Sequence, residues 1–199
     1  MPDQHVEKQL NDLQDWQLVA LSAAMTERMF PNFALFSRLV EFGDAGQLRQ
    51  ILNAIWDHLG NSKVKMNFEV QLDNVEANMP DLEEYSMYGA YPALDAVVAL
   101  YSTLNSVIAT DATEVANVIN LSRECVASYI EVSEANDQMS DEEVVRMINT
   151  HDMMEQEEAF VEEVLARITQ AEPSASLVNE LRLLAENEGV SNIGISDED

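Results

Sequence analysis

The sequence is poor in cysteine, glycine, proline and positive charge, and each shortage excludes a class of protein. Cys125 is the only cysteine, so no intrachain disulfide can form. Six glycines and five prolines in 199 residues are too few for the turns of an all-β architecture. Ten lysines and arginines against 37 acids give a formal net charge of −27. This charge argues against direct binding to nucleic acid or to a membrane through attraction to phosphates.

Targeting signals are also lacking. The stretch from Met1 to Glu7 has neither a basic segment nor an apolar one, so it does not resemble a secretory signal. The longest apolar run, 96–101, is far shorter than the roughly 20 residues that span a membrane. Cys125 lies among the apolar neighbours of a predicted helix, so we interpret it as a packed side chain and not a nucleophile. We therefore expect a cytoplasmic protein.

What the sequence does have is an apolar content of 47% with helical spacing. Leu48, Ile51, Leu52, Ile55 and Leu59 form one apolar stripe, and similar stripes recur along the chain. The pattern predicts helices over 4–13, 16–29, 31–42, 45–59, 67–78, 82–88, 92–109, 112–135, 141–149, 153–170 and 175–187. Only 60–66 could pair as a strand. We predict an all-α, single-domain bundle of about nine to eleven helices.

The expected helix ends carry the residues that cap helices. Short polar residues followed three positions later by an acid or amide predict N-terminal capping boxes. These pairs are Asp44 with Gln47, Asp81 with Glu84, Asp111 with Glu114, Ser140 with Glu143, and Asp152 with Glu155. Pro31 and Pro92 suit the first turn of a helix, where a missing N–H costs nothing.

Charge varies along the chain. From Glu131 to Glu163 there are twelve acids and one base, Arg146. We predict one domain over 1–199, within which 131–170 could form an acidic helical hairpin packed on the rest. Residues 190–199 are expected to form a flexible C-terminal tail.

Several stretches are similar to the YjaG-like family of bacterial proteins, which contains a domain of unknown function. The similar segments are 15–17, 27–33 (ERMFPNF), 42–44, 55–56, 65–68, 88–96 (YGAYPALDA), 139–143 and 188–195 (EGVSNIGI). They are spread over nearly the whole chain. The resemblance implies a compact, mostly helical cytoplasmic protein, and it brings no catalytic residue, cofactor or substrate with it.

Motifs for catalysis or for cofactors are absent. There is no Gly-rich phosphate loop, GxSxG, CxxC or HExxH, and no His follows a Glu by three residues. His151 and Glu155, with Asp152 and Glu158 nearby, could share a divalent ion, but a solvated histidine among acids explains them better. We predict no catalytic residue, no metal and no cofactor.

Three tyrosines meet near a predicted helix start. Tyr85, Tyr88 and Tyr91 surround Gly89, and Asp95 follows one turn into the next helix. These four side chains could form the rim of a small-molecule pocket. A packed corner with satisfied hydroxyl groups is the preferred interpretation.

The acidity has three interpretations. A solvated surface suited to a salty cytoplasm ranks first, and a docking face for a basic partner follows closely. Metal binding ranks third. The densest acids are Glu155, Glu157, Glu158, Glu162 and Glu163, of which 155, 158 and 162 share one side of a helix.

The function hypothesis is therefore a non-enzymatic interaction or regulatory module that uses this acidic surface to bind a basic protein. The alternative is a small-molecule-binding protein or enzyme with its site at the Tyr85–Asp95 corner. A homodimer is also compatible with the apolar helix faces.

Overall fold

The structure is a computed structural model that describes residues 4–196, with side chains from residue 8 onward. The described chain forms nine α-helices and one 3-10 turn. They are α1 (Gln4–Asn11), α2 (Asp15–Val40), α3 (Ala45–Leu59), α4 (Phe68–Glu76), α5 (Ala90–Ile108), α6 (Ala112–Glu134), α7 (Asp141–Asn149), α8 (Asp152–Thr169), α9 (Ala175–Glu186) and η1 (Asn187–Gly189). Within residues 4–196 there is no strand, only an isolated bridge between Val190 and Ser196. The all-α bundle that the sequence predicts is confirmed.

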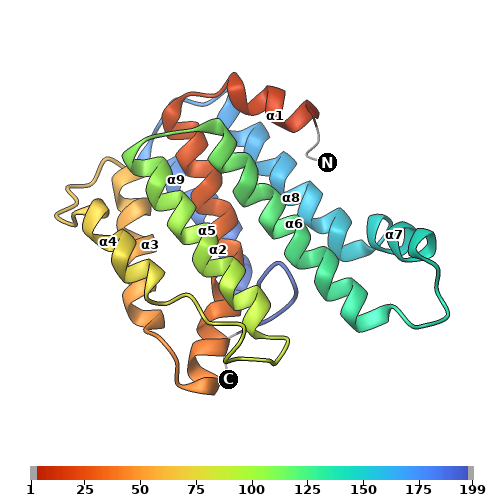
Figure 1. Cartoon of the computed structure of the whole chain (residues 1–199). Helices are drawn as coiled ribbons and strands as arrows, with labels where there is room; N and C mark the ends of the chain where they lie inside the picture. The colour runs from red at the N-terminus through yellow and green to blue at the C-terminus, as the bar shows by residue number, and fades with distance from the viewer. Residues whose placement is uncertain (1–3, 197–199) are drawn as a thin grey trace.

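The longest helix, α2, forms the centre of the bundle. Nineteen of its 26 residues are buried, as its almost continuous apolar sequence requires. Figure 1 shows α5 lying along α2, with α3 and α4 on one side and α6 and α8 on the other. The helix α9 packs against α2 and α3. No helix within residues 4–196 is long and apolar enough to cross a bilayer.

Three helices, α3, α6 and α7, begin at the caps that the sequence predicts. The side chains of Asp44 and Asp111 accept backbone N–H bonds at the starts of α3 and α6. Ser140 and Glu143 form a complete capping box at α7. For α8 the predicted cap is shifted by one residue, because His151 and not Asp152 accepts the backbone N–H of Met153.

Pro31 corrects one predicted boundary. We expected it to start a new helix, but it lies inside α2, which continues from Asp15 to Val40. A proline in a helix interior lacks one N–H bond and costs about 3 kcal/mol. Nearby, the backbone carbonyl of Arg28 accepts a hydrogen bond from the backbone N–H of Asn192, at 3.2 Å. The helix continues through Pro31, whose neighbours on both sides are buried in the core.

The predicted helix over 82–88 is absent. Asp81 does start a turn, since its carboxylate accepts the N–H of Glu83 and its carbonyl accepts that of Tyr85. The turn does not propagate, and the Tyr85 ring packs against Phe36 and Phe42, with 5.3 Å between ring centroids in each pair. Aromatic packing thus takes the place of a further helical turn.

The two helices of the expected acidic hairpin, α7 and α8, differ in burial, because α8 packs into the core and α7 lies at the surface. On α8, Phe160, Val164 and Ile168 belong to the same hydrophobic core as α2 and α5. The neighbouring α7 has no buried residue and projects from the bundle beside the ends of α6 and α8 (Figure 1).

The prediction of a flexible C-terminal tail is wrong for residues 190–196. Ser191, Asn192 and Ile193 are buried with 3% or less of their surface exposed. Residues 197–199 lie outside the described residues. We call residues 190–196 the C-terminal strap.

Candidate functional site

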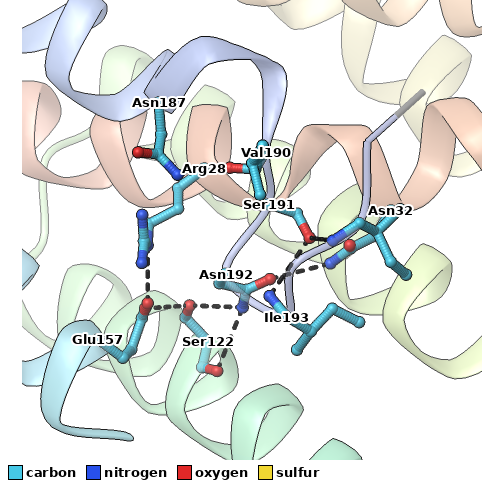
Figure 2. A network of polar contacts seen from close by, with 10 residues as sticks. Arg28, Asn32, Ser122, Glu157, Asn187, Val190, Ser191, Asn192 and Ile193 are labelled. Atoms are coloured by element: carbon cyan, nitrogen blue, oxygen red, sulfur yellow. Dashed lines mark hydrogen bonds and ion pairs between the residues drawn. The ribbon is translucent and has the colours of Figure 1, made fainter. Parts of the chain in front are cut away.

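The centre of the bundle contains a buried ion pair between two helices. Arg28 of α2 donates through Nε to Glu157 Oε2 of α8 at 2.8 Å, and the Glu157 side chain is fully buried (Figure 2). The Arg28 guanidinium also lies 4.7 Å from the centre of the Phe160 ring. A buried carboxylate is tolerated only when it is paired and hydrogen-bonded, so this pair fixes how α8 sits on α2.

The strap completes the network around this pair. Ser122 of α6 donates its hydroxyl to Glu157 Oε1 at 2.5 Å, and Asn192 Nδ2 donates to Ser122 Oγ at 3.0 Å. Asn192 Oδ1 in turn accepts from Asn32 Nδ2 at 3.0 Å (Figure 2). Helices α2, α6 and α8 and the strap are thus joined by polar contacts shielded from solvent. A serine beside a carboxylate could suggest nucleophilic chemistry, but its burial gives a substrate no access.

Glu27, next to Arg28 in sequence, points toward a different part of the bundle. It is 2% exposed and accepts hydrogen bonds from Arg49 Nη1 at 2.5 Å and from Trp56 Nε1 at 2.8 Å, both on α3. The Arg49 guanidinium stacks on Phe30, 3.9 Å from the ring centre. An open cavity of about 700 Å³ lies outside this cluster, and Arg182 and Glu186 of α9 line it. Arg182 is already held by Glu186 and by Asn53 of α3.

The structure separates the predicted tyrosine corner into two clusters. Tyr85 belongs to the aromatic group with Phe36 and Phe42. Tyr88 stacks on Tyr91, with 6.4 Å between ring centroids, and lies 6.2 Å from the Tyr129 ring of α6. The small-molecule hypothesis for this corner stays a prediction.

Asp95, the fourth member of that corner, is half-buried between α5 and α6. The pKa of Asp95 is raised from 3.8 to about 6, chiefly by burial and also by the nearby Glu124, while a hydrogen bond with Cys125 opposes this rise. Burial and the negative charge of Asp95 also raise the pKa of the Cys125 thiol. Burial is likewise the main cause of a raised pKa at Tyr88. The Cys125 thiol and the Tyr88 phenol are therefore poor nucleophiles near neutral pH.

The predicted acidic residues on α8 occupy different environments. Glu155, Glu162 and Glu163 are exposed, and Glu158 is partly exposed and pairs with Arg123 of α6. Glu157 is fully buried, which corrects its inclusion in the acidic surface. The reason is helical geometry, because 157 lies near the line of the core residues 160, 161 and 164. We call Glu155, Glu158, Glu162 and Glu163 the α8 acidic face.

His151, the one candidate metal-binding histidine, has two hydrogen-bond partners. Its Nδ1 accepts the Met153 N–H at 3.1 Å, so Nε2 is the atom that donates to Glu134 Oε1 at 3.0 Å. This links the start of α8 to the end of α6. Within residues 4–196, no three His, Cys, Asp or Glu side chains approach closely enough to hold a metal ion.

Two sequence signals for the buried network were available. Glu27 and Arg28 are the only charged residues in the 22 positions between Asp15 and Arg38. Charges inside an otherwise apolar helix must be paired in the core. Their partners on other helices, and the role of the strap, could not be read from spacing along the chain.

The geometry defines an all-α protein with a closed polar centre and an acidic exterior. A family model described as "Protein of unknown function (DUF416)" matches residues 5–196. The chain therefore belongs to the DUF416 family.

Relatives and a solved structure agree with this assignment. "Uncharacterized protein YjaG" of Salmonella typhimurium is 34% identical over 188 residues, 94% of each chain. The protein of the same name from Escherichia coli K12 is 33% identical over 187 residues, 94% of this chain and 93% of the relative. The crystal structure of a DUF416 family protein from Shewanella baltica has a TM-score of 0.85 and 36% identity, and covers 96% of this chain and 97% of that one. The fold and the YjaG-like resemblance are thus both confirmed.

Proposed function

We propose that this chain is a non-enzymatic, cytoplasmic interaction module that binds a basic partner protein through the α8 acidic face. The observation that carries the proposal is the placement of charge. Of the twelve acids between Glu131 and Glu163, ten are exposed, and they surround α8 and the projecting α7. An exposed field of one sign attracts a partner of the opposite sign and increases the rate of association.

Two bases near this face offset part of its charge. Arg123 is paired with Glu158, and Arg167 with Glu163 at 2.7 Å. Arg123 comes from the neighbouring α6 and Arg167 from α8 itself, and both hold their partners in place, as an ordered docking surface requires. The buried Arg28–Glu157 pair supports the same view, because it fixes the orientation of α8 from the inner side.

The burial of the polar centre favours binding over catalysis. Ser122 and Glu157 would be the obvious nucleophile and base, yet both have no exposed surface. The thiol of Cys125 is also buried and has a raised pKa. A reaction needs its groups within reach of a substrate, which these positions do not offer.

The proposal is tested by capture from a native bacterial lysate at low salt with three versions of the immobilised protein. The first is the wild type. The second carries Glu155→Gln, Glu158→Gln, Glu162→Gln and Glu163→Gln. The third is a matched control with Asp73→Asn, Glu76→Gln, Glu83→Gln and Glu84→Gln, which removes the same charge from exposed positions on and after α4. In Figure 1, α4 lies on the other side of the bundle from α8.

The expected result is a basic protein retained by the wild type and by the α4 control, and lost from the α8 variant. Raising the salt to about 0.5 M should release it, because the Debye length falls well below 10 Å. Equal retention by the α8 variant and the control would contradict the proposal and indicate attraction by net charge alone.

A further inference from the structure

A groove of about 610 Å³ runs along one flank of α8, between that helix, α6 and the turn from α1 to α2. Its floor contains the apolar side chains of Leu13, Val161 and Leu165. Acids stand along its rim, among them Asp12 and Glu162. The volume is typical of a cavity that binds a ligand or the anchoring side chains of a partner.

Polar contacts hold the walls of the groove at both ends. At one end, Gln17 at the start of α2 donates through Nε2 to the carbonyl of Ile168 on α8, at 2.6 Å. The Gln17 side chain also accepts the backbone N–H of Gln14 at 2.7 Å. At the other end, Arg123 of α6 pairs with Glu158 of α8. These contacts between helices therefore fix the shape of the groove without a bound partner.

The groove follows one line of residues along α8. Glu158, Val161, Glu162, Leu165 and Thr169 all line it, and their spacing of three or four places them on one flank of the helix. From 158 to 169 this line measures about 16 Å at 1.5 Å per residue. It is thus about three helical turns long. Glu163 lies on the opposite flank, beside Arg167.

The charges of the rim are unbalanced. Asp12, Glu158 and Glu162 contribute three carboxylates, and the one lining base, Arg123, is already paired with Glu158. An occupant that suits the groove has apolar side chains for its floor and positive charges for its rim. These two features together describe an amphipathic basic helix.

We infer that the α1–α6–α8 groove binds a basic amphipathic helix of a partner protein, with apolar anchors over Leu13 and Leu165 and with lysines or arginines against Asp12 and Glu162. This inference rests on the proposed function and adds to it. It states that the partner is recognised by apolar anchors as well as by charge, so a basic segment without such anchors binds weakly.

Other occupants fit less well. A second copy of this chain would also bring a net charge of −27 to an acidic rim. Residues 1–3 and 197–199, which lie outside the described structure, contain no lysine or arginine. The complementary charge must come from another protein.

The test uses fluorescence anisotropy with the full chain and three labelled peptides of equal length. The first is a three-turn helix with leucines on one face and lysines beside them. The second keeps the lysines and replaces each leucine with glutamine. The third keeps the leucines and replaces each lysine with glutamine. The first should bind about tenfold tighter than the second or more, since burying even one leucine side chain is worth such a factor.

A blocked groove supplies the decisive variant. Ala166 is exposed and lines the groove, so Ala166→Trp should fill it without disturbing the core. Ala159, also exposed on α8, is two turns earlier and is not among the lining residues, so Ala159→Trp is the matched control. Ala166→Trp should weaken binding of the first peptide, with leucines and lysines, about tenfold. It should leave binding of the second peptide, with glutamines in place of the leucines, within about twofold. Thermal unfolding of both variants confirms that they fold.

Each outcome separates the two proposals. If both lysine peptides bind equally and Ala166→Trp changes neither, the groove is not the site, although the acidic face could still bind a basic partner. If the leucine–glutamine peptide binds as well as the leucine–lysine peptide, the rim does not select charge and the inference fails. If no lysine peptide binds at all, the proposed function fails together with the inference.

Discussion

At the scale of single residues, the fold should be sensitive to substitution at the buried Arg28–Glu157 pair. Arg28→Met leaves a fully buried carboxylate without its cation, which should cost about 3–5 kcal/mol of unfolding free energy. Adding Glu157→Gln removes the unpaired charge and keeps an acceptor for Ser122. The double variant should therefore be more stable than Arg28→Met alone. Urea denaturation measures the unfolding free energy of both variants, and a double variant no more stable than Arg28→Met alone would contradict this account.

Asp95 is the residue that should make stability depend on pH. Its pKa is about 6 in the folded protein and 3.8 ordinarily, so the folded state binds the proton more tightly than the unfolded state. Stability should then fall as pH rises from about 4 to above 6, by no more than about 3 kcal/mol.

Asp95→Asn is the matching test of that charge. The variant should be more stable than the wild type at pH 7 and equal to it near pH 4, because the wild-type carboxyl is protonated there. The unfolding free energies of the wild type and of Asp95→Asn are measured at several pH values. Subtracting one from the other at each pH removes the contribution of the other acids, which both proteins share. A difference that is the same at pH 4 and pH 7 would show that Asp95 does not titrate as described.

Cys125 should be chemically silent in the folded protein. Its side chain is 2% exposed and burial raises the pKa of its thiol, so little thiolate is available to a reagent. A chromogenic disulfide reagent should react slowly in buffer and at once in concentrated urea. The sequence already indicated a packed thiol, because Cys125 stands among apolar helix neighbours. Rapid reaction of the native protein would instead place this part of α6 at the surface.

At the scale of elements, periodic segments could be predicted and contacts between distant segments could not. The long helices and their caps follow from local spacing, as Asp44 and Ser140 show. Pro31 misled the prediction because α2 is buried on both sides of it, which spacing along the chain does not reveal. Tyr85 misled it because its ring packs against Phe36 instead of continuing a turn.

The candidate site shows the same limit. Spacing placed Glu155, Glu158 and Glu162 on one side of α8, which the helix confirms. It also placed Glu157 in the acidic cluster, because the sequence does not distinguish one buried acid from the exposed acids beside it. The partners that hold Glu157, Arg28 and Ser122, are on two other helices. Only the packing of the bundle reveals that this carboxylate faces inward.

The C-terminal strap should behave as a structural element of the core. Asn192→Ala removes the side-chain bonds to Asn32 and Ser122, which should cost about 2–3 kcal/mol because buried polar groups lose their partners. Asn179→Ala, at an exposed position of α9, is the control and should stay within about 0.5 kcal/mol of the wild type. Thermal unfolding compares the two. Equal stability of the two variants would mean that the strap is only loosely attached.

At the scale of the whole molecule, the dominant property is the net charge of −27. Repulsion among so many surface carboxylates destabilises the compact state, and salt weakens this repulsion by screening the charges. The same screening weakens attraction to a basic partner. Salt should thus stabilise this protein and release its partner. The interpretation of the acidity as salt tolerance predicts the gain in stability, and the interpretation as a docking surface predicts the loss of binding.

The stability half of this argument has a direct test. Raising NaCl from about 0.1 M to about 1 M shortens the Debye length from about 10 Å to about 3 Å. We expect Tm to rise by at least about 2–4 °C, the shift that about 1 kcal/mol produces in a chain of this size. The four-residue variants of α8 and α4 both lower the net charge from −27 to −23. They should reduce the rise equally, because repulsion acts over the whole surface. A smaller rise in the α8 variant alone would place the repulsion within the docking face, and a Tm independent of salt would mean that the carboxylates are too far apart to oppose folding.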